Sequence, residues 1–167
     1  MAENSIQQKG LKNGKNIEGS LEDWEQELEA QAIDLKKQFD DAMYESRNGK
    51  PGGWFRYTLR LRSPRIDRDK GKKETARSIF IEWRKMDWAT YPDGKKKYRA
   101  KYIRKAAGSY RYATSRFRPV NDKERNLIEN LEDQFAEIRT QVSIIGSIRK
   151  TLANQRRRIE RKAGGQE

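Results

Sequence analysis

Apolar residues recur every seven positions in the last third of the chain, and no other feature constrains the fold as strongly. One series consists of Leu131, Ile138, Ile145, Leu152 and Ile159. A second series begins with Ile128, Phe135 and Val142 and is continued by Arg149 and Arg156. Such spacing is typical of a helix that packs a narrow seam against another helix. It predicts a long, coiled-coil-like helix over residues 121–162, capped by Asn121 or Asp122.

A second amphipathic helix is predicted over residues 19–48. Ser20-Leu-Glu-Asp23 resembles a capping box, and the Gly- and Pro-rich residues 48–53 are expected to end the helix. Apolar residues at steps of three and four define its packing face: Leu21, Trp24, Leu28, Ala32, Leu35, Phe39 and Ala42. The other side is mainly acidic, which favours packing or a partner protein over contact with phosphate. Residues 1–18 have little apolar content and are predicted to form a disordered arm.

Between these helices the apolar period changes to two, which indicates strands. Four apolar residues, Phe55, Tyr57, Leu59 and Leu61, alternate with polar or basic ones. A second strand is predicted near residues 77–89, with Ile79, Ile81 and Trp83 on one face, and a third near residues 96–104. The turn at residues 91–94 contains Pro and Gly. We therefore expect an α+β fold in which residues 54–118 form a basic three-stranded antiparallel sheet flanked by the two helices.

The chain carries a formal net charge of +13, which favours polyanionic partners such as DNA. Strand alternation predicts that the cations of the sheet share one outward face and bind DNA. These candidate residues are Arg56, Arg60, Arg62, Arg84, Lys95, Lys96, Lys97, Arg99, Lys101 and Arg104. We expect Arg56, Arg60 and Arg84 to contact bases or the nearby backbone, and Lys95, Lys96 and Lys97 to contact phosphates.

Three alternatives stay open beside duplex DNA binding. The cations of the sheet can simply form a solvated face that protects its edges. Phe80 and Tyr98, if they point outward, can stack on single-stranded DNA or RNA. The helices can make the chain a coiled-coil interaction or structural protein. The seam of the last helix can pair with the first helix, with a second copy of the chain, or with both.

The composition argues against catalysis. The chain contains neither cysteine nor histidine, which excludes disulfides, zinc sites with Cys or His ligands, and acid–base catalysis by histidine. The acidic residues of the middle segment show no spacing typical of a metal nuclease. We expect no enzyme activity and no cofactor. No apolar run is long enough to span a membrane, and no signal peptide is recognisable, so we expect a cytoplasmic protein without a membrane partner.

Several short motifs between about residues 54 and 150 resemble the MobI group of conjugative-transfer proteins. They are Ser78-Ile-Phe-Ile-Glu-Trp83, Gly94-Lys-Lys-Lys, Tyr102-Ile-Arg-Lys105 with Gly108 and Tyr110, and Leu131-Glu-Asp-Gln-Phe-Ala-Glu-Ile-Arg139. The resemblance implies an auxiliary factor of integrative and conjugative elements or related plasmids, acting at the origin of transfer beside the relaxase that nicks it. Together with the charge, it predicts a protein that recognises duplex DNA at this origin and helps to recruit or position the relaxase. A two-fold dimer would bind an inverted repeat.

Overall fold

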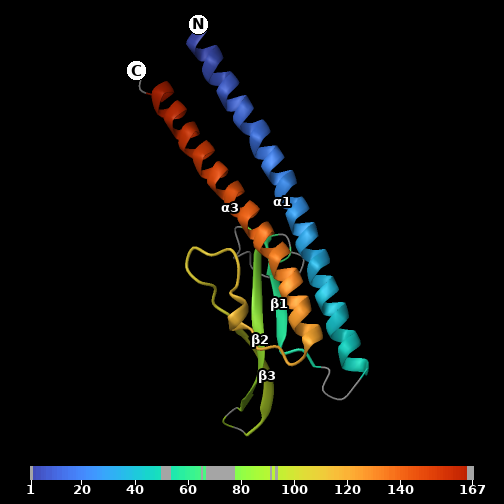
Figure 1. The fold of residues 1–167 in the computed structure, drawn as a ribbon. Coiled ribbons are helices and arrows are strands. Elements are labelled where there is room, and N and C mark those ends of the chain that lie inside the picture. Colours follow the sequence, from blue (N-terminus) through green and yellow to red (C-terminus); the bar gives the residue numbers. More distant parts are fainter. Residues whose placement is uncertain are drawn as a thin grey trace. The chain divides into compact units, whose positions relative to one another are not determined.

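The computed structural model describes residues 2–49, 54–64, 66, 78–90, 92 and 94–164. Its elements are α1 (Ala2–Gly49), β1 (Tyr57–Arg62), β2 (Phe80–Thr90), β3 (Lys96–Tyr102), the 3-10 turn η1 (Thr114–Arg116) and α3 (Asp122–Gly164), shown in Figure 1. They confirm the predicted α+β class, with a three-stranded antiparallel sheet, two flanking helices and a long C-terminal helix. Lys70, Lys72 and Lys73, in the basic segment of the sequence between β1 and β2, lie outside the described residues.

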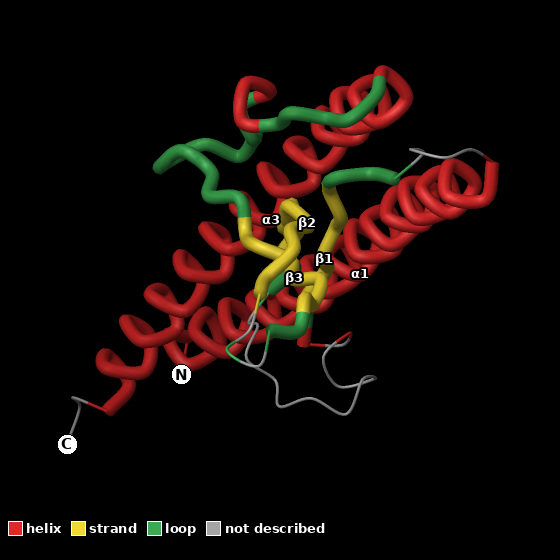
Figure 2. Tube along the Cα trace, turned by 90° about the horizontal axis from the view of Figure 1, so that it is seen from below, coloured by secondary structure: helices red, strands yellow, loops and turns green. Residues whose placement is uncertain are grey.

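The chain forms two compact units, of which Glu29–Thr140 contains the sheet. The strand order is β1-β2-β3, and Leu59 lies opposite Trp83 in the register. Figure 2 shows the three strands lying side by side. The Trp83 ring contacts Phe39 of α1 and Phe135 of α3, with centroids 5.2 and 6.2 Å apart. Both helices therefore pack on the same face of the sheet, which we call the covered face.

The connector between β3 and α3 also contributes to this core. Phe117 contacts Tyr57 and Trp83 with ring centroids 5.1 and 5.5 Å apart, and Tyr112 is fully buried. The Tyr57 hydroxyl accepts a hydrogen bond of 2.6 Å from the backbone N–H of Arg118. Apart from η1 the segment is irregular, and its aromatic rings complete the layer beneath the sheet.

Buried carboxylates of α3 hold the connector and the sheet to the helix. Glu132 accepts hydrogen bonds from Trp83 Nε1 at 2.6 Å and from the Tyr112 backbone N–H at 2.7 Å. Glu124 accepts three backbone N–H bonds, from Arg56, Tyr57 and Val120, at 2.6, 2.9 and 2.8 Å. Each carboxylate thus satisfies backbone or ring donors that would otherwise be buried without partners.

Asn121 caps α3 as predicted, because its Oδ1 accepts the Glu124 backbone N–H at 2.8 Å. The helix begins at Asp122 and ends at Gly164, close to the predicted bounds of 121–162. Its Leu131 and Ile138 are buried within the same unit, so this part of the apolar seam is used inside the chain.

The other unit combines Met1–Leu28 with Gln141–Glu167 as a pair of helical segments. Trp24 Nε1 donates to Gln141 Oε1 at 3.0 Å. Arg149 and Arg156, the two cations that interrupt the second seven-residue series, pair with Glu25 at 2.6 Å and Glu18 at 3.6 Å. Inside this unit the seam therefore pairs with the first helix, and ion pairs replace apolar contacts at these two positions.

The predicted disordered arm at residues 1–18 differs from the structure, in which α1 begins at Ala2 rather than near Ser20. The segment packs against α3: a Cβ atom added at Gly10 would lie 3.7 Å from Ile159 Cδ1. Pairing with a second helix can stabilise residues whose own composition is a poor helix former. The sequence of the arm alone does not show this partner.

Candidate nucleic-acid interface

The register divides the sheet cations between two faces. Side chains directly opposite each other in an antiparallel pair point to the same side. Thr58, Arg84 and Tyr102 are such neighbours across the three strands, and they lie on the face opposite Trp83. We call this the open face. Its described members are Thr58, Arg60, Arg62, Phe80, Glu82, Arg84, Met86, Tyr98, Ala100 and Tyr102.

Four other cations lie on the covered side of the sheet, beyond the part that the helices cover. Lys85 lies opposite Lys101, and Arg99 and Lys97 follow along β3 opposite Asp87 and Ala89. Lys85, Lys97, Arg99 and Lys101 are all exposed, whereas Trp83 is completely buried. We call these four residues the basic strip.

The predicted single basic face is therefore wrong. Arg60, Arg62 and Arg84 lie on the open face, whereas Lys97, Arg99 and Lys101 lie on the other side. The backbone N–H of Ile103 donates to the Trp83 carbonyl at 3.0 Å, which continues the same register beyond β3. This pairing places the odd-numbered residues of β3 on the same side as the odd-numbered residues of β2.

The basic strip lies on a two-stranded ribbon. β1 pairs with β2 only as far as Lys85, and β3 pairs with β2 from Arg84 onward. Beyond the bond from the Met86 N–H to the Arg56 carbonyl, residues 87–90 and 96–99 have one neighbouring strand each, and they project past the end of β1 (Figure 1). Gly94 has a φ of 73°, a conformation that favours glycine, in the turn between the two strands. We call residues 85–101 the β2–β3 ribbon.

The ribbon is strongly cationic. Asp87 lies 3.3 Å from Lys101 and 3.9 Å from Lys85. Among the described residues of the ribbon it is the acidic one. Lys95 is exposed at the turn, next to Lys96, whose side chain lies outside what the structure describes. Over residues 85–101 the sequence has six Lys or Arg residues against two carboxylates, Asp87 and Asp93, which leaves an excess of positive charge.

The arginines of the open face make contacts within the protein. Arg84 Nη2 donates to the Ala100 carbonyl at 2.8 Å, and Arg60 lies 3.9 Å from Glu82 directly opposite it. Arg62 is half-buried opposite Phe80, and Arg104 is exposed just after β3. These arginines are positioned by their neighbours but keep part of their surface in solvent.

Arg56 precedes β1, and its side chain is directed to the connector rather than to the ribbon. Its Nη1 donates to the Arg118 carbonyl at 2.9 Å, and its backbone carbonyl accepts from the Met86 N–H at 2.7 Å. Its expected contact with DNA bases stays a prediction. Lys85 was not among the DNA-binding residues predicted from the sequence. Its position two residues after Trp83 indicates that it lies on the same face of β2 as Trp83.

Burial shifts the pKa of three groups that hold the core together. Burial raises the pKa of Glu124, against the effect of its three backbone donors. Burial lowers the pKa of Lys105, and the nearby Arg139 lowers it further. Burial, and then the neighbouring Tyr102 side chain, raises the pKa of Tyr112. These groups belong to the packing between the sheet, the connector and α3.

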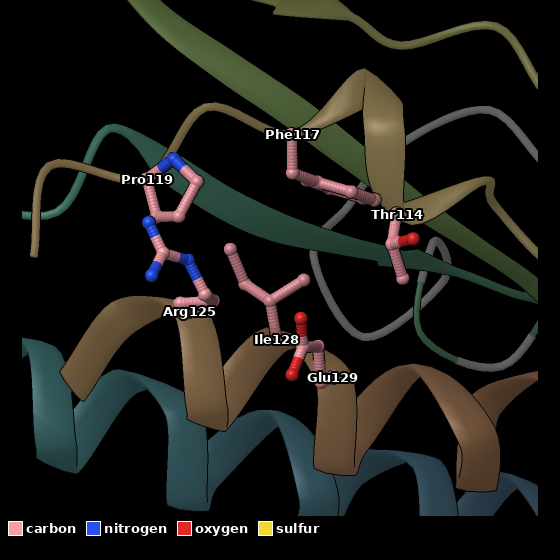
Figure 3. Close-up of a pocket in the computed structure, with 6 residues that line it drawn as sticks. All are labelled: Thr114, Phe117, Pro119, Arg125, Ile128 and Glu129. Atoms are coloured by element: carbon pink, nitrogen blue, oxygen red, sulfur yellow. The ribbon is translucent and has the colours of Figure 1, made fainter. Parts of the chain in front are cut away.

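A small hollow opens beside the start of α3 (Figure 3). It is lined by Thr114, Phe117, Pro119, Arg125, Ile128 and Glu129. Arg125 already pairs with Asp122 at 2.8 Å, so its charge is partly compensated. Within the described ranges no three acidic, His or Cys side chains gather as a metal site, and no helix is apolar and long enough to cross a membrane.

Comparison with known proteins identifies a family. The profile of a protein family described as MobI protein matches residues 28–153, which is most of the chain. No curated protein and no solved structure matches. The matched range includes the sheet, the connector and most of α3, and it confirms the family that the short motifs suggest.

Proposed function

The chain belongs to the MobI family, and we propose that it is an accessory protein of conjugative mobilisation whose β2–β3 ribbon binds duplex DNA at the origin of transfer. The observation that carries this proposal is the position of the basic strip on a projecting two-stranded ribbon. Lys85, Lys97, Arg99 and Lys101 occupy neighbouring positions on one side of it.

The shape of the ribbon suits a DNA groove. The major groove is about 12 Å wide and accepts a two-stranded β element. A three-stranded sheet with two helices on one face is thicker than this, but the residues beyond β1 have only one neighbouring strand each. The ribbon is therefore the part of the sheet that enters a groove, with Arg99 near its middle.

The charge of the ribbon supplies affinity. Each phosphate that a cation neutralises releases counterions, so log K falls with log salt by about 0.9 per contact on duplex DNA. Lys85, Lys95, Lys97, Arg99 and Lys101 provide phosphate contacts, and the arginine fork of Arg99 is also suited to a guanine edge. Binding is consequently strong at low salt and weakens steeply as salt rises.

In this proposal, α1 binds and recruits the relaxase. Its exposed residues include many carboxylates, which repel DNA and attract a basic protein surface: Glu22, Asp23, Glu27, Asp34 and Asp41. Homodimerisation stays a prediction. Leu131, Ile138 and Ile145 are buried within the chain, so a dimer would need a surface other than this seam.

Footprinting on the origin region of the element tests the proposal. At moderate salt we expect protection of a defined site, and protection no better than on random DNA of equal length would reject origin recognition. Gel-shift titration of Arg99→Glu against Lys37→Glu tests the ribbon, because Lys37 is an exposed cation of α1 and both changes alter the net charge equally. Equal losses of affinity in the two variants would reject the ribbon as the contact surface.

A purely structural or interaction role is the second candidate, and the pairing of helical segments in the unit of Met1–Leu28 and Gln141–Glu167 favours it. Light scattering of the full chain combined with a duplex shift assay separates the two. An oligomer without DNA affinity at low salt would support the interaction role.

A further inference from the structure

Three aromatic rings are exposed on the open face, away from the basic strip. Phe80, Tyr98 and Tyr102 keep 48%, 43% and 51% of their surface in solvent. By contrast, Tyr57 and Trp83 on the covered face, and Phe39 of α1 beside them, are almost completely buried. Exposed aromatic rings beside cations are the elements of a base-stacking surface.

The rings are evenly spaced along the sheet. Phe80 belongs to β2, Tyr102 lies opposite Arg84, and Tyr98 lies opposite position 88 of the same strand. The rings thus recur every four residues along the direction of β2. At a rise of about 3.3 Å per residue, neighbouring rings are roughly 13 Å apart and the row is roughly 26 Å long. Such a row is long enough for several nucleotides.

Arginines lie beside these rings. Arg62 is directly opposite Phe80, and Arg84 is directly opposite Tyr102, so each pair brings a guanidinium stem and a ring to adjacent positions. Arg60 completes the set in the middle of β1, and Glu82 is the acidic residue among the described members of this face. The face combines positive charge with flat apolar surfaces, which is the combination that binds an anionic strand with exposed bases.

Duplex DNA does not suit this face. Paired bases are stacked inside the helix and offer the protein only their edges. Rings roughly 13 Å apart can bind bases that have left the stack, because every base has a π-face that can stack on a ring. The open face and the basic strip therefore fit two different forms of nucleic acid.

We propose that the open face is a second site, which binds an unpaired nucleic-acid strand by stacking bases on Phe80, Tyr98 and Tyr102 while Arg60, Arg62 and Arg84 lie along its phosphates. Its rings lie on the face opposite the basic strip, so either binding mode can exist without the other, although Tyr98 belongs to the β2–β3 ribbon. In a mobilisation protein it holds a strand that has separated from its complement while the ribbon stays on the adjoining duplex.

Fluorescence anisotropy with the full chain tests the site. The probes are a labelled oligo-dT of about 20 nucleotides, an oligo-U of the same length and a duplex of about 20 base pairs. Each is long enough for a site of several nucleotides with flanks. Phe80→Ala with Tyr98→Ala removes two rings and should weaken oligo-dT binding by at least about 25-fold, from stacking losses of about five-fold or more per ring. For Phe80→Ala alone, duplex affinity should stay within about two-fold, because Phe80 lies outside the β2–β3 ribbon and the basic strip is unchanged.

Matched controls separate stacking from charge and from folding. Phe80→Tyr with Tyr98→Phe keeps both rings and should retain wild-type affinity for oligo-dT. Tyr44→Ala removes a ring of α1 that is 66% exposed and should have no effect. Ultraviolet cross-linking of wild-type protein to bromouracil-substituted oligo-dT should yield adducts at Phe80 or Tyr98, and this measurement needs no variant to fold.

The possible outcomes are distinct. Oligo-dT binding that is unchanged in the double alanine variant, or cross-links confined to the basic strip, would overturn the second site even if duplex binding is found. Duplex binding that fails while ring-dependent oligo-dT binding persists would reject the ribbon proposal and leave this site standing. Ring-dependent binding that is stronger for oligo-U supports the same site and identifies its ligand as RNA.

Discussion

Glu132 and Arg139 form a buried bidentate ion pair across two turns of α3. Oε1 of Glu132 lies 2.8 Å from Nη1 of Arg139, and Oε2 lies 3.2 Å from Nη2. Arg139 also donates to the Tyr110 carbonyl at 2.8 Å and to the Ile81 carbonyl at 3.3 Å. The pair therefore links the helix to both the connector and β2, and it holds the strand from which the ribbon continues.

Removing one member of this pair should destabilise the sheet unit strongly. Glu132→Ala leaves the Arg139 charge, the Trp83 ring N–H and the Tyr112 backbone N–H without their acceptor. Loss of one partner of a buried pair costs about 3–5 kcal/mol, because the other charge stays buried. Urea denaturation monitored by tryptophan fluorescence measures the change in free energy of unfolding.

Two further variants check the cause. Glu132→Leu combined with Arg139→Met removes both charges and should cost less than the sum of the single changes. Arg125→Ala breaks an exposed pair with Asp122 on the same helix and should change stability little. A loss below about 1 kcal/mol for Glu132→Ala would show that water or another acceptor compensates.

Glu124 should make stability depend on pH in the direction opposite to most carboxylates. Burial raises its pKa above the ordinary value of 4.5, so the folded state favours the protonated form. Its contribution to stability is fully present below pH 4.5 and is lost as pH rises through the raised folded pKa. The free energy of unfolding of wild type minus that of Glu124→Gln should therefore decrease as pH rises above 4.5.

Urea titrations at a series of pH values measure this difference. Glu129→Gln, at an exposed position of the same helix, serves as the control and should show a difference that varies little with pH. A wild-type advantage that grows with rising pH would mean that the three backbone N–H donors outweigh burial and that the folded state prefers the carboxylate.

The elements of the fold could be predicted from apolar periodicity because their buried residues are consecutive members of one pattern. Leu59, Leu61, Ile81 and Trp83 all lie on the covered face at the predicted period of two. The start of α3 could be predicted because Asn121 has a local capping partner. These features depend on residues that are close in sequence, so they can be read from one sequence alone.

The faces of β3 could not be predicted in the same way. Tyr98, Ala100 and Tyr102 alternate with cations and suggest a buried side, but β3 pairs with β2 largely beyond the part that the helices cover. Alternation identifies a core face only where something covers one side of the strand. The burial of Glu124 and Glu132 could not be predicted either. A glutamate on a helix usually faces solvent, and the buried partners of these two residues are distant in sequence.

The basic strip should determine the salt dependence of duplex binding. Lys97→Ala should weaken binding to all duplex sequences alike and reduce the slope of log K against log salt by about 1, because one phosphate contact is lost. Lys37→Ala removes an exposed lysine of α1 and should leave the slope unchanged. Anisotropy titrations of one duplex at several salt concentrations measure the slope. Equal slopes for wild type and Lys97→Ala would place the phosphate contacts elsewhere.

Gly14→Ala tests whether residues 1–18 form a helix or a disordered arm. The structure places Gly14 inside α1, and a Cβ atom added there meets nothing within 4 Å. Alanine is favoured over glycine by about 1 kcal/mol in a helix interior, so the variant should raise the helical signal in far-ultraviolet circular dichroism and the free energy of unfolding of this segment. Gly94→Ala is the opposite control, since its φ of 73° strains any residue with a Cβ atom and should lower stability. If Gly14→Ala changes neither the dichroism nor the hydrogen-exchange protection of residues 2–18, the segment is not helical in solution and the prediction of a disordered arm is the correct one.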